Sequence, residues 1–183
     1  MLMAAASPIS FASWQSLLDN FAIHEAAFGG REIGILQSLR EVPGFLSFLV
    51  VYILLVIAEQ RLAFLSLALL GVGVAVTGYF PTALGLYITT IVSSIGFHYY
   101  ETCNQSLALQ WLDKKTAPAV LGRIYGVGAT AQVLTLGSIF IAYFIASGQV
   151  SWTFLANSTG LVTSTDTYNM IYVATGMITV IMA

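Results

Sequence analysis

The stretch LAFLSLALLGVGVAVTGYF, residues 62–80, contains no charged side chain. Its length matches the ~20 apolar residues that an α-helix needs to cross the hydrocarbon core of a bilayer. A strand of a membrane barrel would alternate lipid-facing and lumen-facing residues over ~10 positions, whereas this apolar run is continuous. Residues 62–80 therefore predict a transmembrane helix.

The composition of the whole chain has the same character. Of its 183 residues, 58% are hydrophobic and 8% are charged, and the mean hydropathy is +0.88. A soluble domain carries about 25% charged residues because its surface must be hydrated. The composition therefore predicts an integral membrane protein whose main partner is the lipid bilayer.

The same sequence argues against several other classes of protein. The net charge is −2 and no basic cluster is present, so we expect no nucleic-acid partner. Cys103 is the only cysteine, which excludes a disulfide framework. No phosphate loop, nucleophile elbow or zinc motif occurs, so we expect no cofactor, no bound metal and no catalytic residue.

Hydrophobic segments predict an all-α polytopic membrane bundle of five to six transmembrane helices in a single domain. The segments cover residues 3–23, 33–57, 62–80, 82–112, 120–146 and 168–183. The first segment is the weakest, because Gln15, Asp19 and Asn20 interrupt it. The last is shorter than the ~20 residues of a full span. We therefore expect the chain to be a fragment that is truncated at its C-terminus.

Basic residues predict the orientation of the bundle. The connections after the second and fourth segments carry Arg61, Lys114, Lys115 and Arg123, whereas the opposite connections carry Arg31 alone. Cytoplasmic loops carry an excess of lysine and arginine. We therefore expect the first set in the cytoplasm and the polar loop 147–167 outside, with the bacterial inner (plasma) membrane as the location.

Polar residues inside the second segment form the first candidate site. Gln37, Arg40, Gly44 and Ser47 share one helical stripe, and Glu41 follows Arg40 directly. Neighbouring residues point about 100° apart on a helix, so we expect Arg40 and Glu41 not to pair simply with each other. The stripe either lines a solute cavity, which makes Gln37, Arg40, Glu41 and Ser47 substrate-binding candidates, or holds this helix to another through an ion pair. Pro43-Gly44 predicts a bend.

The fourth segment contains the second candidate site. His98 and Glu101 are spaced i, i+3, and Gln105 continues their face. This spacing suits a proton relay or a gate near the cytoplasmic side, and the alternative is hydrogen bonding between helices. Gln132 in the fifth segment is a lone amide, which is more typical of a packing hydrogen bond than of a ligand contact.

Small residues predict where helices approach each other closely. Gly71 and Gly78 lie in the third segment, and Gly122 and Gly126 follow G-x-x-x-G spacing in the fifth. Such residues let helix backbones come into contact in lipid, so we expect all four to serve helix packing.

The order of these features resembles the N-terminal six-helix half of a major facilitator superfamily transporter. The resemblance rests on IGILQSLREVPGF (33–45), the short connection EQR (59–61), GFHYYE (96–101), and LQWLDKK (109–115) followed by Pro118 and LGR (121–123). The usual connection between the second and third helices of this family is longer and rich in glycine. Here it is reduced to AEQRL (58–62), in which Glu59 and Arg61 would form a reduced version of the gating ion pair.

The resemblance implies twelve helices in two halves around a central cavity that opens alternately to each side. It also implies a small-molecule solute, a coupling ion and, as a partner, the missing C-terminal half of the same protein. We therefore expect secondary active transport, and we expect the isolated chain to insert into a membrane without moving solute.

The alternative is a non-transport membrane protein, either an intramembrane enzyme or a structural subunit. An enzyme needs catalytic side chains that converge at one depth. The pairs Arg40/Glu41 and His98/Glu101 are expected toward opposite membrane faces, which favours a pathway over a reaction centre. The sequence therefore predicts a transporter and not an enzyme.

Overall fold

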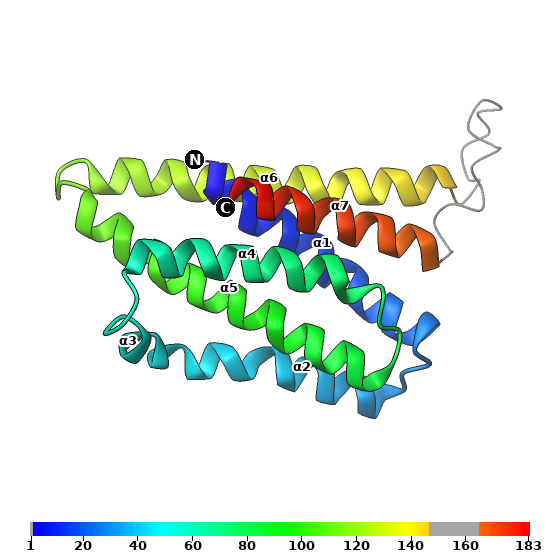
Figure 1. The fold of residues 1–183 in the computed structure, drawn as a ribbon. Coiled ribbons are helices and arrows are strands. Elements are labelled where there is room, and N and C mark those ends of the chain that lie inside the picture. Colours follow the sequence, from blue (N-terminus) through cyan, green and yellow to red (C-terminus); the bar gives the residue numbers. More distant parts are fainter. Residues whose placement is uncertain (1, 147–164) are drawn as a thin grey trace.

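A computed structural model describes residues 2–146 and 165–183, and the described chain is helical without strands (Figure 1). The elements are α1 (Leu2–Glu25), α2 (Gly30–Phe45), the 3-10 helix η1 (Leu46–Leu49), α3 (Val50–Ile53), α4 (Glu59–Thr77), α5 (Ala83–Trp111), α6 (Ala117–Ala146) and α7 (Thr165–Met182). The all-α prediction is confirmed. Most of the predicted outer loop, residues 147–164, lies outside the described residues.

Three segments of the described chain are long and apolar enough to cross a membrane. They are Gly30–Ile53, Glu59–Thr77 and Ala117–Ile141, and a shorter apolar helix covers Thr167–Met182. These segments indicate a helical membrane protein. The six-span arrangement stays a prediction, because α1 and α5 are long helices that are not among the three.

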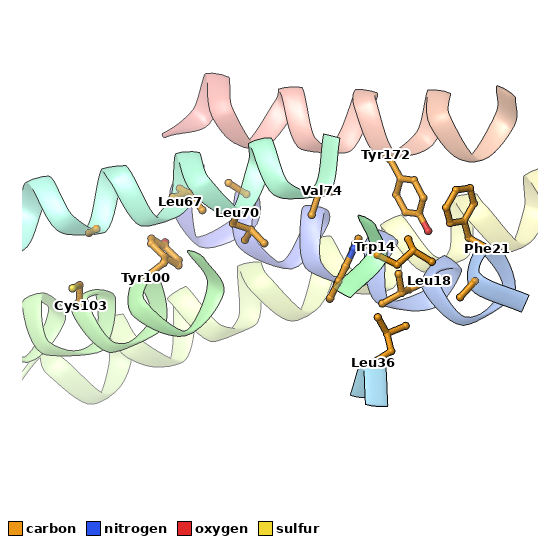
Figure 2. Packing of buried hydrophobic residues seen from close by; sticks show 14 of the residues in the cluster. Trp14, Leu18, Phe21, Leu36, Leu67, Leu70, Val74, Tyr100, Cys103 and Tyr172 are labelled. Carbon is orange, nitrogen blue, oxygen red and sulfur yellow. The ribbon is translucent and has the colours of Figure 1, made fainter. Parts of the chain in front are cut away.

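The long helices pack side by side in alternating directions (Figure 1). Helix α4 lies against α5 and α7, α1 lies against α6 and α7, and α2 lies against α5. Buried side chains fill the space between α1, α4 and α7 (Figure 2); the largest include Trp14, Leu67, Leu70 and Tyr172. Among the described helices, α6 contacts mainly α1, and many of its described side chains are exposed.

The second predicted segment is not one continuous α-helix to residue 57. The α-helix ends at Phe45, a 3-10 turn follows, and helical structure stops at Ile53. Pro43 has no backbone N–H and therefore cannot donate to the carbonyl four residues earlier. The turn begins two residues after Gly44, which agrees with the bend that Pro43-Gly44 predicts.

Helix α1 ends in a compact chain reversal. The Phe28 amide donates to the Ala22 carbonyl at 3.0 Å, the Ala26 amide donates to the same oxygen at 3.2 Å, and Ala27 has φ 53°. A residue with positive φ just after the end of a helix is usually glycine, and here it is Ala27. The buried ring of Phe28 joins the core and fixes where α2 begins.

Two of the four predicted packing glycines lie at the contact between α4 and α7. A Cβ atom on Gly71 would lie 2.7 Å from the Gly176 carbonyl oxygen, and one on Gly78 would collide with the Asn169 side chain. Gly122 and Gly126 differ, since a Cβ atom on either would meet no atom of the described residues within 4 Å. None of the described helices packs closely against these two glycines, so their role in helix packing stays a prediction. The spacing alone did not reveal that α6 turns this face outward.

Candidate functional site

A cavity of about 490 Å³ lies between α1, α5 and α6. Its volume falls within the range of ~300–1,000 Å³ that is typical of small-molecule sites. Apolar and aromatic side chains form much of its wall, and polar side chains come from all three helices: Ser7, Gln15, Glu101, Asn104, Tyr125 and Gln132. Gln15 and Gln132 are exposed, so the cavity is open on the side where they lie.

Two contacts between α1 and α5 set the geometry of this cavity. The Tyr100 hydroxyl donates to the Met3 carbonyl at 3.0 Å. The rings of Phe11 and Phe97 stack with their centroids 3.9 Å apart. Ser7 lies one turn from both Met3 and Phe11, and Glu101 follows Tyr100 and lies one turn from Phe97. These antiparallel contacts therefore bring Ser7 and Glu101 to the same cavity.

Ser7 occupies an unusual position in α1. It is 1% exposed, and its Oγ atom has no hydrogen-bond partner among the residues that the structure describes. A helical serine commonly bonds the carbonyl four residues earlier, which here belongs to Met3 and accepts from Tyr100. The next residue, Pro8, has no N–H and also lines the cavity. The wall of the cavity therefore presents an unsatisfied hydroxyl beside an interrupted turn of helix.

Glu101 brings the carboxylate of this cavity and is partly buried. Gln105, one turn further along α5, is placed to donate a hydrogen bond to it. Among the described residues that line the cavity, none is basic. The carboxylate therefore has an uncharged amide beside it and no counter-charge in the wall.

A second cavity, of about 370 Å³, adjoins the first. Tyr100, Asn104 and Ile124 line both. The second cavity is largely apolar and continues along α5 to Trp111 and Leu112. The two cavities together follow α5 toward the end of the bundle where basic residues predict the cytoplasm.

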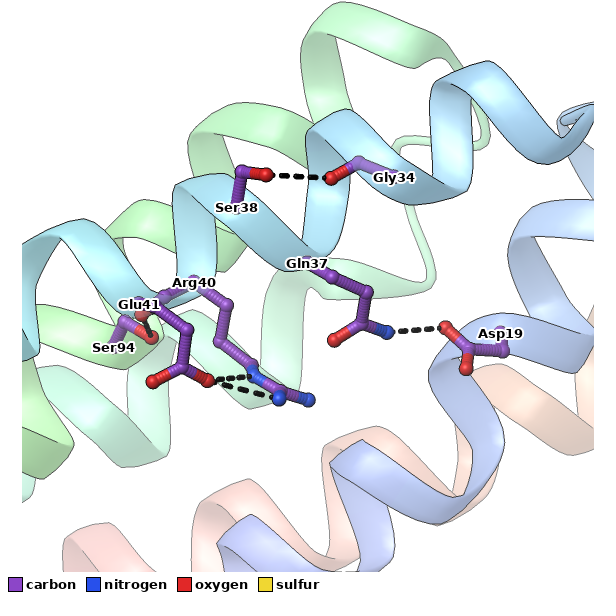
Figure 3. Close-up of polar contacts among 7 residues, drawn as sticks. All are labelled: Asp19, Gly34, Gln37, Ser38, Arg40, Glu41 and Ser94. Carbon is purple, nitrogen blue, oxygen red and sulfur yellow. Dashed lines mark hydrogen bonds and ion pairs between the residues drawn. The ribbon is translucent and has the colours of Figure 1, made fainter.

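Arg40 and Glu41 correct a prediction, because they form an ion pair with each other. Both Nε and Nη2 of Arg40 donate to one oxygen of Glu41, at 3.0 Å and 2.9 Å (Figure 3). The angle between neighbouring helical positions did not prevent this contact, because the long arginine side chain folds back across the helix surface. The two residues thus neutralise each other locally.

The second predicted segment also makes polar contacts with two neighbouring helices, α1 and α5. The Gln37 amide donates to Asp19 of α1 at 2.8 Å, and the Ser94 hydroxyl of α5 donates to the Arg40 carbonyl at 2.7 Å (Figure 3). Ser47 is half-buried in η1. The stripe therefore joins α2 to its neighbours, and none of its members lines either cavity described above.

His98 and Glu101 do not act as one pair in this structure. The His98 ring lies against Gly44 of α2, where a Cβ atom would come within 2.7 Å of the ring. Glu101 lines the cavity on the side of α1 and α6. Residues three apart on a helix differ by about 60° in direction, and here that difference assigns them to different neighbours. A relay between them stays a prediction.

The proposed gating pair also differs from expectation. Glu59 accepts a hydrogen bond from Gln110 of α5 at 2.8 Å, and Arg61 is exposed. The contact joins the start of α4 to the end of α5, so Glu59 fixes this end of the bundle through an amide and not through Arg61.

Several residues of the cavity were missed from the sequence. Gln15 was visible only as an interruption of the first segment, and Gln132 was interpreted as a packing amide. Ser7 and Asn104 attracted no prediction. A hint existed in the spacing, because Asn104 follows Glu101 by three residues, but the partner helix could not be chosen without the tertiary structure.

The fold and the cavity define the class of protein as a helical membrane protein with a partly polar cavity between its helices. Within the described ranges, no group of three or more histidine, cysteine, aspartate or glutamate residues is placed to hold a metal ion. Comparison of the chain with protein-family models, with curated protein sequences and with solved structures found no match.

Proposed function

We propose that the chain forms one wall of a solute pathway in a secondary transporter of the major facilitator type. The observation that carries the proposal is the cavity between α1, α5 and α6, which amide, hydroxyl and carboxylate side chains line together with apolar ones. Polar groups at membrane depth are costly and are tolerated where they line a cavity or a pathway.

The adjoining apolar cavity supports the same proposal. It shares three residues with the polar cavity and leads along α5 toward one end of the bundle. A binding chamber that continues toward one membrane face is the arrangement that alternating access requires. The order of spans, which resembles the N-terminal half of that superfamily, supplies the type of transporter.

Uptake by cells that produce the protein in its native form tests the proposal. Cells with and without the protein receive one mixture of amino acids, sugars and amines, and mass spectrometry measures what accumulates or is depleted inside them. We expect at least one solute to differ. Gln132→Leu removes an amide of the cavity wall and should reduce this difference several-fold.

Ser138→Leu on the same helix is the matched control, because Ser138 is exposed and lines none of the cavities described above. It should leave uptake unchanged at an equal amount of protein in the membrane. The proposal fails if no solute differs, or if Gln132→Leu behaves like Ser138→Leu.

A further inference from the structure

We infer that the cavity between α1, α5 and α6 binds a small organic cation, with the Glu101 carboxylate as its counter-charge and the Ser7 hydroxyl as a hydrogen-bond acceptor. This inference rests on the proposed function, since it names the chemical class of the solute. The charge, the unsatisfied hydroxyl and the aromatic wall each support it.

The charge balance of the cavity comes first. A carboxylate in apolar surroundings is unfavourable unless a proton or a positive charge neutralises it. The described wall contains no basic side chain, and Gln105 brings only an uncharged amide. Arg40 is held by Glu41, and Arg123 borders a separate cavity on α6. A cationic ligand would supply the positive charge that the described wall lacks.

Ser7 gives the second, independent reason. Its hydroxyl oxygen is buried and has no partner within the described part of the chain. An ammonium group has several N–H donors. One such group can donate to a carboxylate oxygen and to a hydroxyl oxygen at once when both face one cavity. Ser7 and Glu101 both line this cavity, and the contacts Met3–Tyr100 and Phe11–Phe97 hold their two helices together beside it.

The aromatic wall gives the third reason. Phe11, Phe97, Tyr100 and Tyr125 line the cavity. Aromatic faces attract cations and also cover the apolar part of an amine. The ring pair of Phe11 and Phe97 lies one turn from the polar groups, so it suits a ligand with an apolar body and one charged end. Such a ligand is a small aryl- or alkylamine and not a sugar or an anion.

Three probes of nearly equal shape test the inference on the purified chain in lipid nanodiscs. They are 2-phenylethylamine, which is cationic at neutral pH, 2-phenylethanol, which is neutral, and 3-phenylpropionate, which is anionic. Equilibrium binding of tritiated amine and competition by the other two give three affinities. We expect the amine to bind about tenfold or more tightly than the others, because a charge-assisted hydrogen bond contributes more than a neutral one.

Variants on both helices separate the named groups. Glu101→Gln keeps the shape and removes the charge, so amine affinity should fall to that of the alcohol. Ser7→Ala removes a hydroxyl that has no partner, so the melting temperature should hold while amine affinity falls several-fold. Asp113→Asn, in the exposed connection between α5 and α6, is the matched charge-removal control and should change nothing.

The inference is overturned if the amine does not bind, or if it binds no more tightly than the alcohol and the anion. Unchanged amine affinity in Glu101→Gln would also overturn it. If Glu101→Gln does not fold, Ser7→Ala decides the matter, and unchanged amine affinity in that variant overturns the inference. Failure of transport is a separate result. Amine binding that depends on Glu101 without uptake by cells refutes the proposed transport alone, and uptake restricted to neutral or anionic solutes refutes the cation site alone.

Discussion

Alanine at Gly71 should weaken the contact between α4 and α7. Gly71 and Gly176 face each other, and a Cβ atom on either one would press on the carbonyl oxygen of the other. The Cβ atom of Gly71→Ala would also lie 2.8 Å from the Val180 side chain. Both backbones are in direct contact here, so no flexible side chain can turn away to make room.

The size of the destabilisation follows from the distances at this contact. Non-bonded atoms in favourable contact lie about 3.5–4.0 Å apart. A Cβ atom 2.7 Å from the Gly176 oxygen would therefore increase the distance between the two helices by roughly 1 Å. Overpacking of this kind typically costs about 1–3 kcal/mol. Helix propensity offsets part of it, because alanine in a helix interior is favoured over glycine by about 1 kcal/mol.

Gly126→Ala is the matched control, since a Cβ atom there meets nothing within 4 Å. Both variants gain the same helix propensity, so the difference between them measures the overpacking alone, about 1–3 kcal/mol. For a chain of this size each kcal/mol corresponds to about 2–4 °C in the melting temperature. Circular dichroism of the purified variants during heating in one detergent measures the difference between their melting temperatures.

The double variant sharpens the test. Once Gly71→Ala has separated the helices, Gly176→Ala should cost less than it does alone, because both press on one contact. If Gly71→Ala melts at or above the temperature of Gly126→Ala, the close approach of α4 and α7 is refuted. Strict additivity of the two glycine variants would refute their facing each other.

Two further predictions concern the chain reversal and the orientation. Ala27→Gly should stabilise the protein by about 0.5–1 kcal/mol, because relief of the left-handed conformation exceeds the added freedom of the unfolded chain. In the same thermal assay the control Ala129→Gly, at an exposed position of α6, should destabilise the protein by about 1 kcal/mol. A lower melting temperature for Ala27→Gly would contradict the left-handed conformation of residue 27. Single cysteines at Gly30 and Lys115, in a Cys103→Ala background, should react with an impermeant maleimide from opposite sides of the membrane; reaction of both from the same side would contradict the alternating arrangement.

Much of the fold was predictable because it depends on local composition. The apolar runs are continuous and end at polar or charged connections such as Glu59 and Asp113, so the positions of α4 and α5 followed to within a few residues. The second segment was predicted too long. Its apolar pattern continues to residue 57, but the helix hydrogen bonding changes after Pro43-Gly44, and hydropathy does not register backbone bonding.

The candidate site was far less predictable. Glu101 was selected because a carboxylate at membrane depth is costly, and it does line the main cavity. Its expected partner His98 lies instead against α2, and the groups that share its cavity come from α1 and α6. Spacing along one helix states which residues share a face but not which neighbour that face meets.

The sequence by itself determined that this protein is a helical membrane protein, because an apolar chain in lipid must satisfy its backbone hydrogen bonds within each segment. Only the tertiary structure decided which polar groups meet. Ser7 and Glu101 share a cavity because Tyr100 bonds Met3 and Phe97 stacks on Phe11, and these contacts join segments that are distant in sequence. Arg40 pairs with Glu41 through the conformation of one flexible side chain. The shared cavity of Ser7 and Glu101, by contrast, depends on the packing of whole helices, which no local pattern encodes.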